Sequence, residues 1–140
     1  MRIQVTIVAI GLALSGCSTV GGIPRGAGPA VSQGGPAAPE TIISAMDGGL
    51  IGGSVGAGLS ENDRRLALQA EYRALEHTAA GKAVDWQGSR GSGAVTASQP
   101  YRVGSQDCRQ YTQAVNVGGQ TRNARGTACR NPDGSWTPLT

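Results

Sequence analysis

Two alternating segments around a pair of glycines constrain the fold of this chain more than any other feature. Residues 108–117 and 120–130 flank Gly118-Gly119, a pair that is typical of a two-residue β-hairpin turn. Successive residues of a strand point to opposite faces, so an alternating pattern allows one face to be buried. The sequence therefore predicts an antiparallel hairpin with one buried face. The residues that alternate with polar neighbours are Tyr111, Gln113, Val115 and Val117.

The same hairpin brings two cysteines level with each other. Counting outward from a Val117–Gln120 pair places Cys108 directly opposite Cys129. This is a non-hydrogen-bonded position, where Cα atoms lie about 4.5 Å apart, and the register therefore permits a disulfide. If the bond forms, we expect it to stabilise the domain by about 3 kcal/mol.

The beginning of the chain matches a bacterial lipoprotein signal. Arg2 precedes an apolar stretch, and Leu14-Ser15-Gly16-Cys17 fits the lipobox pattern at the processing site. We expect cleavage of residues 1–16, a diacylglycerol on the Cys17 thiol and an acyl chain on its new amine. The alternative is an ordinary secretory signal with a cysteine near the cut. Lipidation of Cys17 and export to an oxidising compartment leave Cys108 and Cys129 as a disulfide pair.

Residues 17–41 are predicted to form the lipidated tether of the protein. They are rich in Gly, Pro, Ala and Ser and carry almost no charge. Such a segment cannot bury enough apolar surface to offset the conformational entropy that ordering would cost. We therefore expect a flexible connection between the lipid anchor and the rest of the chain.

Residues 42–59 combine glycines and apolar side chains in a pattern that fits a glycine zipper. Small residues recur every four positions, the spacing that lets helices approach closely, so the segment could associate with a membrane or with another copy of itself. Glycine disfavours a helix by about 1 kcal/mol per position, and Asp47 is costly in hydrocarbon. A glycine-rich linker is therefore the alternative. The zipper glycines are Gly48, Gly49, Gly52, Gly53 and Gly56.

Residues 60–140 are predicted to form one α+β domain, a single N-terminal helix followed by a small antiparallel β-sheet. Ser60 is a suitable N-terminal cap, and an apolar stripe predicts a helix that runs to about Ala79. The pattern then changes to a period of two residues, which is typical of strands. Besides the hairpin, strands are expected at residues 84–86, at 93–97 and around Trp136.

Several motifs of this domain are similar to those of one protein family. They are Asp63-Arg64-Arg65-Leu66, Arg73-Ala74-Leu75-Glu76, Gly81, Val84 with Trp86, Tyr101, Cys108-Arg109-Gln110-Tyr111-Thr112-Gln113, Val115, Gly118-Gly119, Gly126, Ala128-Cys129-Arg130 and Pro132-Asp133-Gly134-Ser135-Trp136. With the lipoprotein signal, they resemble the rickettsial-type 17 kDa surface antigen family over residues 42–137. The resemblance implies a lipoprotein of the outer membrane with a glycine zipper, a small β-rich domain and no enzymatic activity. In this chain a Pro-rich tether replaces much of the family's longer glycine-rich region.

The residues themselves show no convincing catalytic motif, and no metal site or further cofactor is expected. The formal net charge of +3 is too mild to indicate nucleic-acid binding. Aromatic and arginine side chains of the sheet have two interpretations, packing within the domain or a binding patch for an acidic envelope component. The strand alternation divides the arginines between the two faces, which weakens the second interpretation. The candidate binding residues are Arg109, Tyr111, Arg122, Arg130 and Trp136.

The leading functional hypothesis is a non-enzymatic lipoprotein of the outer membrane, with a structural or surface-antigen role. Its partners would be membrane lipid, through Cys17, and other copies of the chain, through the zipper. The alternative is a tethered binding module that recognises a partner protein, peptidoglycan or lipopolysaccharide.

Overall fold

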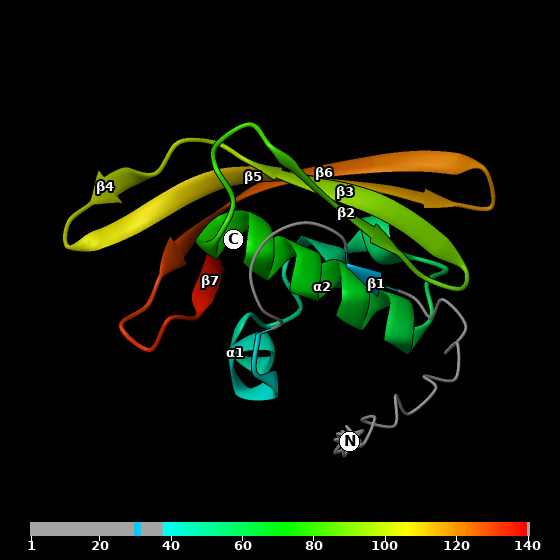
Figure 1. Cartoon of the computed structure of the whole chain (residues 1–140), viewed down its shortest axis with the longest axis horizontal. Coiled ribbons are helices and arrows are strands. Elements are labelled where there is room, and N and C mark those ends of the chain that lie inside the picture. Colours follow the sequence, from blue (N-terminus) through cyan, green and yellow to red (C-terminus); the bar gives the residue numbers. More distant parts are fainter. Residues whose placement is uncertain (1–29, 32–37, 140) are drawn as a thin grey trace, which may run out of the picture.

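The computed structural model describes residues 30–31 and 38–139 of the chain. The predicted signal peptide, Cys17 and most of the tether lie outside these residues. The described part combines one long helix with an antiparallel sheet that curves over it (Figure 1). An α+β domain is therefore confirmed.

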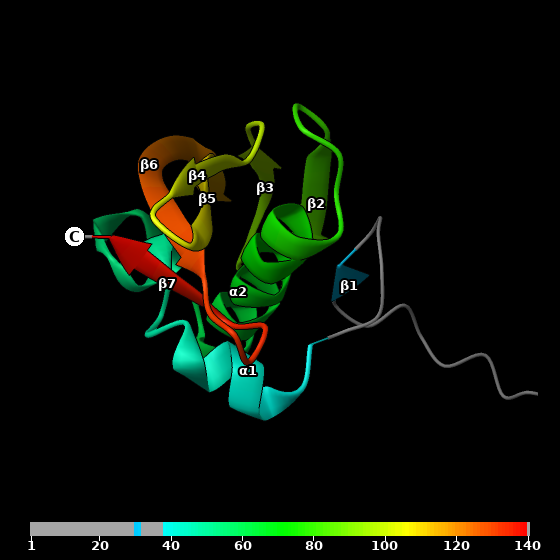
Figure 2. The same cartoon turned by 90° about the vertical axis from the view of Figure 1, so that its left-hand side faces the viewer.

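The sheet runs in the order β1-β2-β3-β5-β6-β7, and β4 pairs with β5 beyond the end of β3. All its neighbouring strands are antiparallel. Figure 2 shows the sheet bending around the helix from β2 to β7. The strands are β1 (Ala30–Val31), β2 (Ala83–Gln87), β3 (Gly91–Ala97), β4 (Tyr101–Val103), β5 (Gln106–Val117), β6 (Gln120–Arg130) and β7 (Trp136–Leu139). The sequence patterns predicted five of these strands and missed β1 and β4, which are only two and three residues long.

The β5–β6 hairpin has the predicted register. Val117 pairs with Gln120, and Cys108 pairs with Cys129 at the other end of the ladder. The two cysteines form a disulfide, and their Cα atoms are 4.0 Å apart. Gly118 and Gly119 both have positive φ, as a tight turn between twisted strands requires.

The two faces of the sheet have different environments. On β5, Tyr111, Gln113 and Val115 are buried against the helix, whereas Thr112 and Ala114 on the opposite face are partly exposed. We call these the inner face and the outer face. The inner face continues through buried residues of the neighbouring strands, Val84, Trp86, Val95 and Ala97.

The long helix α2 (Glu61–Glu76) begins where the sequence predicts. The Ser60 side chain accepts a hydrogen bond from the backbone N–H of Asp63 and so caps the first turn. The helix ends at Glu76, earlier than the predicted end near Ala79. An arginine side chain from the sheet donates hydrogen bonds to backbone carbonyl groups at the end of the helix. The sequence of the helix itself does not predict this contact.

The glycine-rich segment is ordered and does not form the predicted zipper helix. It consists of a short helix, α1 (Glu40–Ala45), followed by turns and two 3₁₀ turns, η1 (Leu50–Gly52) and η2 (Ser54–Gly56). A continuous helix is excluded because Gly48 and Gly49 have φ angles of +78° and +54°. A flexible linker is wrong as well, because five apolar residues of the segment are buried in the core: Ile43, Met46, Ile51, Val55 and Leu59.

We call residues 46–59 the strap, because they lie across α2 and the end of the sheet. Strap residues pack into the same hydrophobic cluster as α2 and the inner face. The predicted boundary at residue 60 therefore divides a single core. Among the described residues, no helix has the length and apolar character needed to cross a membrane.

Candidate functional site

Three carboxylates of α2 attach three different parts of the chain to this helix. Asp63 lies in its first turn, Glu71 near its middle and Glu76 at its end. Asp63 and Glu71 have no exposed surface. Because buried carboxylates are costly unless hydrogen-bonded, their partners are central to how the domain holds together.

Asp63 binds the turn between β2 and β3. Its carboxylate accepts hydrogen bonds from the backbone N–H groups of Ser89 and Arg90, both at 2.9 Å, and from the Ser89 hydroxyl at 3.2 Å. Burial acts to raise the pKa of Asp63, but these hydrogen bonds outweigh it and hold the pKa below its ordinary value. The first turn of α2 is thereby fixed to the tip of a sheet hairpin.

Glu71 binds the strap. The backbone N–H groups of Leu50 and Ile51 each donate to one of its carboxyl oxygens at 3.0 Å. The Tyr111 hydroxyl donates to the same carboxyl group at 3.3 Å from the inner face. Burial raises the pKa of Glu71 to about 8, although all three hydrogen bonds act to lower it. The carboxyl group joins the strap, α2 and β5 at one point.

Glu76 binds the end of the sheet. Arg130 donates two hydrogen bonds to its carboxylate, at 2.8 and 2.9 Å, and the Trp136 indole N–H donates a third at 2.9 Å. The hydrogen bond from Arg130 is the main cause that lowers the pKa of Glu76. This carboxylate therefore fastens β6 and β7 to the last turn of α2.

Arg109 explains the early end of α2. Its guanidinium donates to the backbone carbonyls of Ala74, Leu75 and Thr78, at 3.0, 2.7 and 3.1 Å. The Nε atom also donates to the Ser98 carbonyl at 2.8 Å. The last carbonyls of a helix have no partners within the helix, and a cation there also suits the helix dipole. Arg109 is therefore a buried cap that β5 supplies.

The contacts of the five candidate binding residues distinguish the two interpretations of these side chains. Arg109, Tyr111, Arg130 and Trp136 are engaged with α2, and only Arg130 among them is more than slightly exposed. Arg122 contacts the strap, where its guanidinium donates to the Ala57 carbonyl at 2.8 Å. These contacts support the packing interpretation of all five candidates. Sequence reasoning could have found Glu71, since it lies on the same helical face as Leu68 and Leu75.

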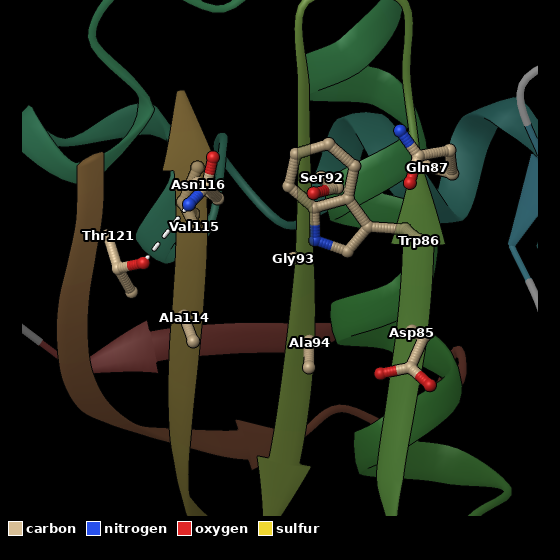
Figure 3. Close-up of a pocket in the computed structure, with 10 residues that line it drawn as sticks. All are labelled: Asp85, Trp86, Gln87, Ser92, Gly93, Ala94, Ala114, Val115, Asn116 and Thr121. Atoms are coloured by element: carbon tan, nitrogen blue, oxygen red, sulfur yellow. Dashed lines mark hydrogen bonds between the residues drawn. The ribbon is translucent and has the colours of Figure 1, made fainter. Parts of the chain in front are cut away.

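The outer face is among the surfaces that remain free for binding. A shallow depression of about 350 Å³ crosses β2, β3, β5 and β6 (Figure 3). Ala94 and Ala114 form its floor, and Asn116 donates a hydrogen bond to Thr121 at 3.2 Å on one side. A second depression of about 270 Å³ lies farther along β3 and β5. Its outer-face residues include Thr96, Ser98, Gln110, Thr112 and Arg125.

The comparisons with known proteins concern mainly this domain. A family model described as 17 kDa outer membrane surface antigen matches residues 73–137. The 17 kDa surface antigen of Rickettsia bellii (strain RML369-C) is 47% identical over 85 residues, which cover 59% of this chain and 54% of that protein. The protein of the same name from Rickettsia felis is 46% identical over 82 residues, 56% of this chain and 52% of the relative.

The chain thus spans about half the length of the curated relatives that it matches. No solved structure matches it. The family match covers the last turn of α2, strands β2 to β6 and the first two residues of β7. The resemblance of this chain to the 17 kDa surface antigen family is therefore confirmed, with residues 73–137 as the part that the family model describes.

Proposed function

We propose that this protein is a non-enzymatic lipoprotein of the outer membrane, which holds a rigid α+β domain at the cell envelope through a lipid on Cys17. The observation that carries the proposal is the coincidence of two features in one chain. Leu14-Ser15-Gly16-Cys17 fits a lipoprotein processing site. The C-terminal domain matches a family described as an outer membrane surface antigen.

The polar groups of the domain support a structural rather than a catalytic role. Asp63, Glu71 and Glu76 each receive hydrogen bonds from chain segments that they fix in place. Within the described part of the chain, the hydrogen bonds of the Arg109 side chain all go to backbone carbonyls. A general base or nucleophile needs access to a substrate, and buried groups with this set of partners lack it.

Mass measurement of the N-terminus tests the anchor. The mature protein is expected to begin at Cys17 with a diacylglycerol and an N-acyl chain, and to fractionate with outer membranes. Cys17→Ser should abolish lipid labelling and release the protein from the membrane, whereas Ser18→Ala should change neither. A mature chain cut elsewhere, with Cys17 unmodified, would contradict the proposal.

Protease treatment of whole cells tests which way the domain faces. A surface-antigen role predicts that a tag at the exposed β4–β5 turn, next to Gly104, is cleaved in intact cells. A periplasmic marker must remain protected in the same sample. Cleavage only after the outer membrane is permeabilised would exclude display at the surface and leave an envelope role inside it.

The outer face favours a second candidate function, a tethered binding module. The residues that line its depressions are uncharged except for Asp85 and Arg125, and they combine apolar with polar groups, which suits a partner protein or a glycan better than an anionic ligand. Ala114→Arg would fill the first depression, and Asn62→Arg is a matched control on exposed α2 surface. Loss of one cross-linked partner in the first variant alone would support this candidate.

A further inference from the structure

The strap is bound to the rest of the domain by few polar contacts. Most of its backbone hydrogen bonds close turns within the strap, such as Gly52 N–H to the Gly48 carbonyl at 2.8 Å and Gly56 N–H to the Gly53 carbonyl at 3.1 Å, and two at its start end on carbonyls of α1. The strap belongs to none of the strand ladders. The strap is joined to α2 by the hydrogen bonds to Glu71 and to the sheet by the hydrogen bond from Arg122. Segments with such local bonding open more readily than sheet strands.

The contact at Glu71 fits so closely that only glycine is accommodated beside it. A Cβ atom at Gly49 would meet a carboxyl oxygen of Glu71 and would lie 2.8 Å from a methyl carbon of Leu68. The strap backbone therefore lies directly on α2 at this point. Glu71 itself is fully buried, and this burial depends on the strap that covers it.

The strap also has conformational breaks at both ends. Gly48 and Gly49 have positive φ near its beginning, and Gly58 has a φ of +87° near its end. Glycine adopts such angles at little cost and also leaves them easily. The two breaks allow the intervening turns to move without forcing α1 or α2 to unwind.

We propose that residues 46–59 dock on the α+β domain and leave it as a unit, and that the Glu71 carboxyl group is the latch that controls this step. Release would expose Met46, Ile51, Val55 and Leu59, which are now buried. It would also free the glycine-rich segment for association of the kind expected from a zipper. The proposal does not depend on the lipid anchor.

Proton binding supports this role for Glu71. In the docked state its pKa is about 8, whereas an exposed glutamate has a value near 4.5. A group whose pKa is raised by docking favours the docked state at low pH, and this advantage is lost as the pH rises from 4.5 towards 8. Release should therefore become about tenfold easier per pH unit within this window.

The charged residues named below do not offset the negative charge that Glu71 would carry after losing its proton. From the strap, Asp47 is exposed and would repel an ionised Glu71 if it approached. From β5, Tyr111 donates its hydrogen bond to Glu71, and burial raises the pKa of this tyrosine so that it stays neutral. From β6, Arg122 is occupied by the Ala57 carbonyl, and on α2 itself Arg64 and Arg65 are exposed.

Amide hydrogen exchange of the full chain between pH 5 and pH 8.5 tests the latch. The measured quantity is the opening constant of the Leu50 and Ile51 amides, corrected for the intrinsic pH dependence of exchange. In the natural protein it is expected to rise about tenfold per pH unit up to about pH 8, while the Val115 amide in the middle of the sheet stays protected. Glu71→Gln keeps an uncharged hydrogen-bonding group and should make the strap opening independent of pH.

Glu76→Gln is the matched control, because it removes a carboxylate of the same helix that does not touch the strap. In this variant the opening constants of the Leu50 and Ile51 amides should depend on pH as they do in the natural protein. Tyr111→Phe provides a second variant, in which the loss of a hydrogen-bond donor should raise the pH at which the slope ends. The proposal is overturned if Leu50 and Ile51 exchange only together with Val115. It is equally overturned if Glu71→Gln retains the slope of the natural protein.

Discussion

The β5–β6 hairpin and the strap are both rich in small residues, yet they are held in place in different ways. In the hairpin, alternation, a Gly-Gly turn and two cysteines in register all specify the same structure locally. In the strap, the conformation depends on Glu71 and Arg122, which lie 20 and 65 residues away from their backbone partners. The hairpin is held by many repeated backbone hydrogen bonds, whereas the strap is held by a few hydrogen bonds to specific side chains.

This contrast shows that glycine has two uses in one small domain. At Gly118 and Gly119 it supplies positive φ in a turn, with nothing within 4 Å of an added Cβ atom. At Gly49 it supplies positive φ and also close approach to α2. Spacing in the sequence does not distinguish these uses, because both follow from what lies opposite the glycine.

The largest effect is expected from loss of the disulfide in the hairpin. Replacement of Cys108 and Cys129 by alanine opens a loop with a sequence separation of 21. The free energy of unfolding should fall by about 3 kcal/mol, as measured by urea denaturation. A loss below about 1 kcal/mol would mean that strand pairing alone fixes the hairpin, and the contrast with the strap would then be sharper still.

Arg109→Met should be nearly as damaging, because it leaves the final carbonyls of α2 without their cap. Each buried acceptor that loses its partner costs about 1–3 kcal/mol, and local relaxation should keep the total near 2–3 kcal/mol. Arg125→Met on the outer face is the control and should change stability by about 0.5 kcal/mol or less. Equal effects in urea denaturation would argue against the capping role.

Gly49→Ala and Gly81→Ala separate close approach from backbone strain. Both glycines have positive φ, but an added Cβ atom at Gly81 has nothing within 4 Å, whereas at Gly49 it meets Glu71 and Leu68. Strain alone should cost about 1 kcal/mol at Gly81, and the clash should raise the loss at Gly49 to about 2–3 kcal/mol. Similar midpoints of thermal unfolding for the two variants would show that the strap shifts at little energetic cost to accommodate the new side chain.

The smallest effect is expected at the Glu76–Arg130 pair, because the Arg130 side chain is 40% exposed and solvent screens the interaction. Glu76→Gln should cost about 1 kcal/mol at neutral pH. The pKa of Glu76 is lowered on folding, so its contribution is present above the ordinary glutamate pKa and is lost as the pH falls. The difference between the natural protein and the variant should therefore shrink in urea denaturation at pH 3. A constant difference from pH 7 to pH 3 would show that the charge of Glu76 is not what matters.

Sequence patterns predicted the elements of the domain better than its polar contacts. The cap at Ser60, the hairpin register and the cysteine pair depend on residues close in the chain or related by a fixed count. For Arg109, Tyr111 and Trp136 the sequence left packing and binding as alternatives, and only their contacts with α2 favour packing, because residue type does not show what lies opposite an inner-face side chain. The division of the arginines expected from alternation was wrong for Arg109. It pairs with Ala128 and therefore lies on the same face as Arg122 and Arg130, whereas Arg125, opposite Thr112, lies on the outer face.

The amino-acid sequence by itself determined the α+β class, the hairpin with its disulfide register and the start of α2, because turns, caps and alternation act over short distances. Tertiary structure alone decided that residues 46–59 fold as a strap instead of a zipper helix. The reason is the buried carboxyl group of Glu71, which accepts hydrogen bonds from the strap backbone at Leu50 and Ile51 and belongs to a helix outside the strap. Glycines that could line a helix surface are used here to bring the backbone onto α2.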